Sequence, residues 1–258
     1  TGSTNIGSGA TLQLGDGGTT GSISQTAAVH NNGQLIVDRS NDLTMASPID
    51  GTGSFTQAGT GTTLLTGTNS YTGKTIVSTG TLQIDGDQSA AHGATTVASG
   101  ATLAGSGTVG GNVSVADGAI FAPGAANKGA DTLTINGNLS LGKNSIQNWN
   151  LGEVNSAGGQ YNDLVDVKGD LALGGTLNVS TALGGPDVKN GALDAGVYRL
   201  YSYNGKLSGV LNETLGDIPT ESNVSLGLQT AIAHQVNLVV SDGTLIYWDG
   251  GNPANHGS

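Results

Sequence analysis

The chain has 258 residues, of which 45 are glycine, 36% are hydrophobic, 4% are aromatic and none is cysteine. Its formal net charge is -11 with only eight lysine and arginine residues, so it offers no basic patch for phosphates, and we expect no nucleic-acid partner. A core built mainly of valine, leucine, isoleucine, alanine and threonine favours strands over helices.

A short glycine-containing phrase recurs along the first half of the chain, between apolar residues about six positions apart. The copies follow one another at steps of about 18 to 24 residues, a period typical of solenoids, in which each repeat buries its apolar side against its neighbours. Apolar and polar residues alternate beside each phrase as they do in strands. The inward core positions predicted in this way are Leu12, Leu35, Leu82, Val97, Leu103, Val115, Phe121, Ile135 and Leu141.

The glycines mark corners between short strands, because a sharp turn needs a positive φ or a missing Cβ. Asp, Asn and Ser beside them supply side-chain hydrogen bonds for the same corners. The sequence therefore predicts an all-β chain folded as a parallel β-helix, with regular rungs over residues 1–142.

The second half departs from this period. After Leu141 the step between copies lengthens, and residues 142–163 are interpreted as an excursion from the coil. The end of a solenoid exposes an apolar cross-section that must be covered, so residues 143–258 are expected to form a capping module. Most aromatic residues lie there and are predicted to form its core and a folding seed: Trp149, Tyr161, Tyr198, Tyr201, Tyr203, Tyr247 and Trp248.

Residues 51–84, GTGSFTQAGTGTTLLTGTNSYTGKTIVSTGTLQI, resemble the passenger-associated transport repeat of bacterial type V autotransporters. The likeness is carried by Thr66, Gly67, Asn69, Tyr71, Thr72, Gly73, Val77, Gly80, Thr81 and Leu82. Residues 194–211 and 237–251 resemble the C-terminal end of pertactin-like passengers.

This resemblance implies a right-handed β-helical stalk, exported through the periplasm and displayed on a Gram-negative surface or secreted. It also implies a C-terminal outer-membrane β-barrel translocator in the same full-length chain, and it places residues 143–258 in the autochaperone region that folds first outside the cell. The absence of cysteine favours export, and the start TGSTN leads us to expect part of a longer protein.

Catalytic and metal sites are hard to assemble from this sequence. His30, His92, His234 and His256 lack the paired spacing of a zinc site, and no G-x-S-x-G elbow accompanies a positioned His and Asp. Asp163, Asp166 and Asp170 are interpreted as a solvated edge rather than a cation site. We expect no catalytic residue, no metal and no cofactor.

Three functions stay open. A polysaccharide lyase or hydrolase would need carboxylates grouped with Lys or Arg, whereas Arg39 and Arg199 lie apart from any such cluster. An adhesin or self-associating module would use rows of Thr, Asn and Ser to bind a host surface, a glycan or another passenger copy. A spacer would only hold a distal domain away from the membrane. The sequence favours a non-enzymatic stalk but does not separate adhesion from spacing.

Overall fold

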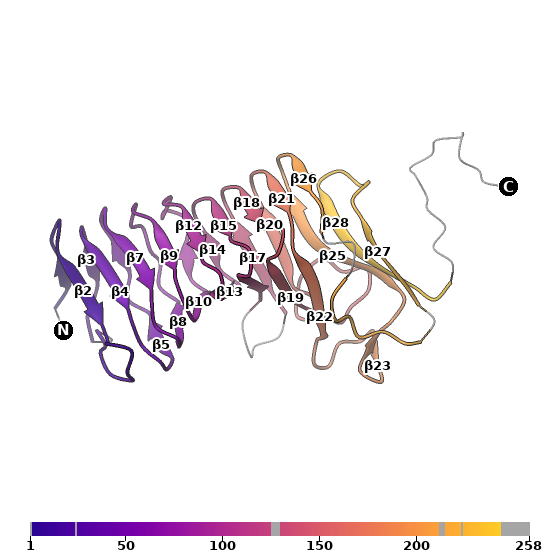
Figure 1. Ribbon diagram of the computed structural model, residues 1–258, viewed down its shortest axis with the longest axis horizontal. Coiled ribbons are helices and arrows are strands. Elements are labelled where there is room, and N and C mark those ends of the chain that lie inside the picture. Colours follow the sequence, from indigo (N-terminus) through magenta and orange to yellow (C-terminus); the bar gives the residue numbers. More distant parts are fainter. Residues whose placement is uncertain (1, 24, 125–129, 212–214, 223, 244–258) are drawn as a thin grey trace.

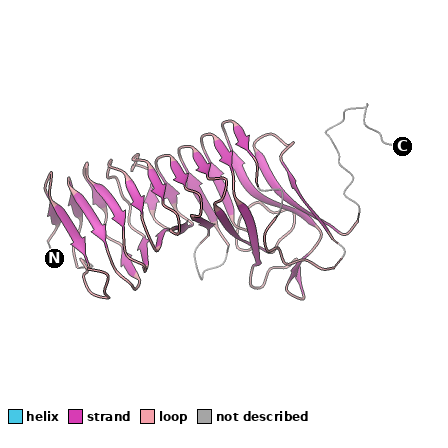
Figure 2. Ribbon diagram, in the orientation of Figure 1, coloured by secondary structure: helices cyan, strands magenta, loops and turns pink. Residues whose placement is uncertain are grey.

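The computed structural model describes residues 2–23, 25–124, 130–211, 215–222 and 224–243. In these ranges the chain forms strands β1 to β28 and no helix, as Figure 2 shows. Accordingly, no described helix is long and apolar enough to cross a membrane. The strands stack along one axis into an elongated coil, with the N-terminus at one end (Figure 1). The expected all-β parallel β-helix is confirmed.

Each turn of the coil passes through three faces. The first face is a nine-stranded parallel sheet made of β2 (Thr11–Leu14), β4 (Gln34–Val37), β7 (Ser54–Gln57), β9 (Thr75–Val77), β12 (Thr95–Val97), β15 (Val113–Val115), β18 (Leu139–Leu141), β21 (Leu171–Leu173) and β26 (Leu207–Gly209). The second face is made of β5 (Leu43–Met45), β8 (Thr62–Leu65), β10 (Thr81–Ile84), β13 (Thr102–Gly105), β16 (Ile120–Pro123), β19 (Ile146–Leu151) and β22 (Thr176–Thr181).

The third face consists of two sheets that follow one another along the coil. The first sheet contains β1 (Thr4–Ile6), β3 (Val29–Asn31) and β6 (Ile49–Asp50). The second contains β11 (Asp87–Gln88), β14 (Thr108–Val109), β17 (Thr132–Ile135), β20 (Leu164–Val167), β25 (Gly196–Tyr203), β28 (Gln235–Ser241) and β27 (Ser225–Gln229). A small hairpin of β23 (Val188–Lys189) and β24 (Ala192–Leu193) stands outside the three faces.

Between the two sheets of the third face lies the segment around Asn69. The backbone N–H of Asn69 donates to the Asp87 carbonyl at 2.9 Å, and its side-chain Oδ1 accepts from the Ile49 N–H at 2.7 Å. Nearby, the Tyr71 ring packs against Phe55, and its hydroxyl is 2.7 Å from the Thr75 hydroxyl. The asparagine and tyrosine of the transport-repeat motif therefore continue the third face where its ladder of strands is interrupted.

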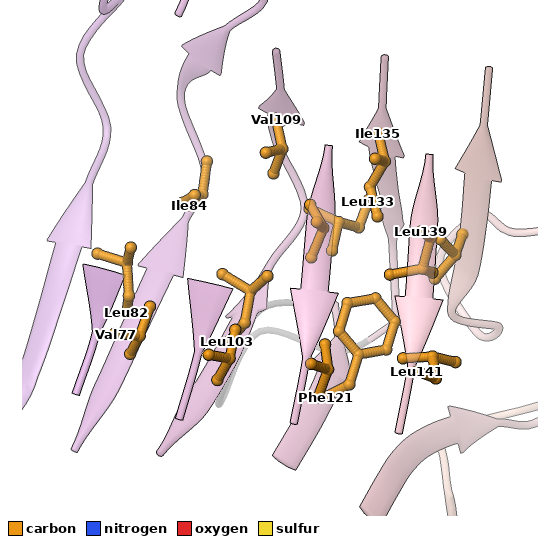
Figure 3. Packing of buried hydrophobic residues seen from close by; sticks show 14 of the residues in the cluster. Val77, Leu82, Ile84, Leu103, Val109, Phe121, Leu133, Ile135, Leu139 and Leu141 are labelled. Atoms are coloured by element: carbon orange, nitrogen blue, oxygen red, sulfur yellow. The ribbon is translucent and has the colours of Figure 1, made fainter. Parts of the chain in front are cut away.

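Inward side chains of successive rungs lie directly above one another. Leu82, Leu103 and Phe121 occupy equivalent positions in β10, β13 and β16, and all are buried (Figure 3). The structure likewise buries Leu35, Val97, Val115, Ile135 and Leu141, whereas Leu12 is partly exposed because β2 has a neighbouring strand on one side only. Each layer gains its stability by excluding water from the layers on either side.

The structure shows no break in stacking at residue 142. The strand β19 pairs with β22 over six residues in parallel, and β26 still pairs in parallel with β21. The interpretation of residues 142–163 as an excursion is therefore wrong for Ile146–Leu151, which is a rung strand. Within residues 142–163, only residues 152–163 leave the coil, and they do so between the second and third faces. A division into two folding units at 142 stays a prediction.

Glycines form a continuous column at the corner before the strands of the first face. The backbone of each rung approaches the rung before it so closely that a Cβ at Gly73 would lie 2.2 Å from the Gly53 carbonyl oxygen. At Gly93 the corresponding distance to the Gly73 oxygen is 1.9 Å. The column consists of Gly33, Gly53, Gly73, Gly93, Gly111, Gly137, Gly169 and Gly205. The copies of the recurring phrase at Gly33, Gly137 and Gly169 fall in this column, where a Cβ would collide with the rung before. The copies at Gly80, Gly100 and Gly118 form the corner between the first and second faces, where each glycine has a positive φ.

Candidate functional site: the C-terminal cap of the coil

Bulky side chains enter the core at the C-terminal end of the coil. Trp149 lies in β19 on the second face and is buried, and Tyr201 reaches it from β25 on the third face. Their ring centroids are 5.0 Å apart at 73°, an edge-to-face contact that is favourable for two aromatic rings. Residues far apart in the sequence, which were predicted to form a folding seed, thus meet across the core. Whether they seed folding stays a prediction.

A buried glutamine beside this pair fixes the tyrosine. The Tyr201 hydroxyl donates to Gln147 Oε1 at 2.6 Å, and Gln147 Nε2 donates to the Gly174 carbonyl at 2.6 Å. Both Gln147 and Tyr201 are fully buried, so loss of either partner would leave a polar group without water. Burial also raises the pKa of Tyr201 well above its usual value, which keeps the hydroxyl protonated as a donor.

The other predicted aromatic residues take different places. Tyr198 is buried in β25 and donates its hydroxyl hydrogen to the Asp194 carbonyl at 2.9 Å. Tyr203 packs against the ring of His234, with centroids 5.6 Å apart. Tyr161 is half-buried in the excursion of residues 152–163 and makes no aromatic contact with other described residues. Tyr247 and Trp248 lie outside the described residues.

The direction of strand pairing changes in this region. The strand β25 pairs in parallel with β20 on one side and antiparallel with β28 on the other, and β28 continues antiparallel into β27. A bulge between Arg199 and Tyr201 accompanies the change. The third face therefore ends in a hairpin, visible at the C-terminal end of the coil in Figure 1, rather than in another identical rung.

Two buried polar residues hold the excursion of residues 152–163 against the coil. Asn162 is fully buried and makes four hydrogen bonds, accepting from the N–H groups of residues 152 and 153 and donating to the carbonyls of residues 153 and 156. Asp163 is also fully buried and accepts from the Asn150 N–H at 2.6 Å, from its side-chain amide at 3.1 Å and from the Asp131 N–H at 3.2 Å. The excursion is a fixed structure.

Burial raises the pKa of the Asp163 carboxyl to about 7, because desolvation outweighs the hydrogen bonds from Asn150 and Asp131 that favour its charged form. Between about pH 4 and pH 7, Asp163 is therefore protonated in the folded state and ionised in the unfolded state. We expect the free energy of unfolding to fall as the pH rises through this window, by at most about 1.4 kcal/mol per pH unit, and this contribution to level off above it.

Urea titrations at a series of pH values measure this dependence. Asp163→Asn should flatten the slope between about pH 4 and pH 7, while Asp42→Asn, at an exposed position, should leave it unchanged. An identical slope in the wild type and in Asp163→Asn would contradict the assignment.

The remaining ionisable candidates do not converge. His30 Nδ1 pairs with the Asp50 carboxylate at 2.8 Å on the surface of the third face, and His256 lies outside the described residues. Asp166 pairs with Lys168 at 2.5 Å, and Asp170 Oδ1 accepts the Lys206 N–H at 2.8 Å. In the part of the chain that the structure describes, no three His, Cys, Asp or Glu residues group as metal ligands would.

Sequence reasoning missed Gln147 and Asn162, and its interpretation of Asp163 as part of a solvated edge is wrong, because this side chain is fully buried and hydrogen-bonded to Asn150 and Asp131. A signal for Gln147 was available, since it alternates with Trp149 and Leu151 in the segment IQNWNL and so occupies an inward position. The burial of Asn162 and Asp163 had no comparable signal, because they lie in irregular backbone just before β20.

Comparison with known proteins gives two matches. Residues 55–84 match the family described as Passenger-associated-transport-repeat. The chain is also 49% identical over 213 residues to the "Adhesin BmaC autotransporter" of Brucella suis biovar 1 (strain 1330). That alignment covers 82% of this chain but 6% of the relative, so the chain corresponds to a small part of a much longer protein.

Proposed function

The chain is part of a type V autotransporter passenger, displayed on or secreted from the bacterial surface, and on this premise we propose that it is a non-enzymatic, adhesive β-helical stalk. We further propose that it is the barrel-proximal part of the passenger, that its full-length chain carries the translocator barrel, and that its C-terminal cap seeds folding during secretion. The observation that carries the adhesive role is the outer surface of the first face.

Outward side chains of the first face stack into a flat, uncharged column. The column begins with Gln13, Ile36, Thr56 and Ile76 and continues through Thr96, Ser114, Ser140, Ala172 and Ser208, each aligned with the next by strand register. In a coil with net charge -11, an extended strip without acidic side chains lets a second passenger copy or a host glycan approach without repulsion. Many weak polar contacts along it would add up through multivalency. A relative named as an adhesin is consistent with this role.

Bead aggregation tests the adhesive role. Beads coated with the purified chain should cluster, and Thr96→Glu with Ser114→Glu should abolish clustering, because the two carboxylates place like charges in the middle of the strip. Thr102→Glu on the outer side of the second face is the matched control and should cluster like the wild type. Failure of the wild type to bind beads, cells or glycans would leave the spacer as the function.

The non-enzymatic role is supported by the placement of the two arginines. The Arg39 guanidinium donates hydrogen bonds to Asn41 Oδ1, from Nε at 3.1 Å and from Nη2 at 2.9 Å, and to the Gly21 carbonyl. Arg199 lies at the far end of the coil, on β25. A polysaccharide lyase would need such cations next to carboxylates in one groove. Incubation with pectate or alginate should therefore produce no absorbance of unsaturated uronates.

A further inference from the structure

A small pocket opens on the outer side of the third face, at the C-terminal end of the coil. Its volume is about 270 Å³. Its floor is formed by Val197 and Arg199 of β25 with Gln235 and Asn237 of β28, which lie side by side in the antiparallel pairing. Residues 155–157 of the excursion form one wall, and Ile232 from the turn between β27 and β28 forms another. Two departures from the repeat, the excursion and the turn of the hairpin, thus enclose this space.

Arg199 is a cation without a partner among the described residues around this pocket. Its Nε is buried and has no hydrogen-bond partner, and no described residue forms a hydrogen bond or an ion pair with its guanidinium. This contrasts with Arg39, whose three guanidinium nitrogens each donate a hydrogen bond to a neighbouring oxygen. A buried donor without a partner is energetically unfavourable. A guanidinium offers two parallel N–H groups that match a carboxylate.

The wall beside Arg199 is held in place before any ligand arrives. The Asn155 N–H donates to the Val197 carbonyl at 2.8 Å, and the Val154 N–H donates to the Asp187 carboxylate at 2.8 Å. Asn162 fixes the same segment from beneath. Asn155 has a φ of 59°, a left-handed conformation that asparagine adopts more readily than most other non-glycine residues. A pre-formed wall lowers the entropy cost of binding.

The rest of the lining indicates what accompanies the negative group. Val197 and Ile232 are 38% and 48% exposed, so an apolar surface remains available at the pocket. The side-chain amides of Asn155 and Gln235 both donate and accept, which suits hydroxyl groups. We propose that this pocket binds an acidic sugar unit of a glycan, with Arg199 on the carboxylate, the amides on the hydroxyls and Val197 and Ile232 against the ring. This inference rests on the proposed adhesive function and names its ligand.

An acidic peptide fits these observations less well. A peptide strand binds by adding to a sheet edge, where main-chain groups are free. The pocket floor is the face of a sheet, and its strands β25 and β28 are paired with each other, with the edge strand β27 outside the lining. The pocket therefore offers side chains rather than a backbone ladder, and its volume suits a single ring.

Ligand-observed NMR and calorimetry on the full 258-residue chain test the proposal. The probes are methyl glucuronide and N-acetylneuraminic acid, with methyl glucoside as the neutral partner and a short acidic peptide as the other source of carboxylate. The acidic sugars should bind, and the neutral sugar should bind at least about tenfold more weakly, because a charge-assisted pair is lost. Arg199→Ala should weaken the binding of acidic sugars by about 10-fold or more. Arg199→Lys should keep only part of the wild-type affinity, because an ammonium lacks the two parallel N–H groups.

Two further variants separate binding from folding. Ile232→Asp leaves the arginine in place but puts a carboxylate at the rim, so it should also weaken acidic sugars, while Lys143→Ala removes a positive charge on the exposed corner before β19 and should change nothing. Unchanged thermal melting of Arg199→Ala and Ile232→Asp confirms folding. Equal binding by the neutral sugar, preference for the peptide, or unchanged affinity in both Arg199→Ala and Ile232→Asp would overturn the proposal. Bead aggregation that persists in Arg199→Ala would leave the adhesive strip standing independently.

Discussion

Leu103→Asp is expected to destabilise the coil by roughly 4 kcal/mol or more, because it places a carboxylate between apolar layers with no partner. Leu103 is fully buried in β13 and stacks between Leu82 of one rung and Phe121 of the next. Protonation of the aspartate would remove its charge, but the unpaired carboxyl would remain. In a solenoid the defect also weakens both adjoining layers, since each rung relies on its neighbours.

Urea unfolding followed by circular dichroism measures this effect. The adjacent Thr102→Asp is the matched control, because Thr102 points outward and is half-exposed. It should change the free energy of unfolding by no more than about 1 kcal/mol. Equal destabilisation by the two substitutions would mean that the inward and outward sides of β13 are assigned wrongly.

A fragment of residues 143–258 is expected to fold by itself and resist protease, whereas residues 1–142 alone should be unstable or aggregate. The longer pairings of the molecule lie within the C-terminal fragment, including the six-residue register of β19 with β22 and the antiparallel register of β25 with β28. The contact of Trp149 with Tyr201 is also internal to it. Bulky aromatic side chains bury more apolar area per residue than the smaller Thr and Val side chains of the regular rungs do. Buried apolar area stabilises the fold by about 25 cal/mol per Å².

The cut at 142 leaves β19 whole, since this strand begins at Ile146. Limited proteolysis and refolding after dilution from urea compare the two fragments. In the whole chain, Tyr201→Ala should slow refolding more than Tyr71→Ala, although both tyrosines are buried and hydrogen-bonded. A stable N-terminal fragment beside an unfolded C-terminal one would place the seed in the regular rungs instead.

The repeating part of the fold could be predicted from the sequence because one rung determines the next. Alternation around Leu82 and Leu103 gives the inward side, and the spaced glycines give the corners. The same reasoning failed at Ile146–Leu151, where a longer step between copies was interpreted as a departure from the coil. The extra residues are inserted at one corner, after β19, and leave the strand itself in register.

The cap could be predicted only in part. The gathering of aromatic residues indicated a different end, and Trp149 and Tyr201 do meet there. The pairing of β25 with β28 and the pocket at Arg199 were not predictable, because each depends on residues far apart in sequence that meet only through the tertiary fold. The four hydrogen bonds of Asn162 are local, but they lie in irregular backbone that follows no periodic pattern. A repeat pattern carries information about neighbouring rungs, and these features lie outside the repeat.

The uneven lengths of the corners determine how such a chain can change over generations. From β14 on, the corner between the third and first faces keeps three residues in four successive turns, at 110–112, 136–138, 168–170 and 204–206. The corner between the second and third faces ranges from residues 106–107 to the long excursions of residues 152–163 and 182–195. Insertions and deletions should therefore accumulate along a single edge of the rod. Its length is then set by the number of rungs, so two passengers of very different residue counts could extend equally far from the cell.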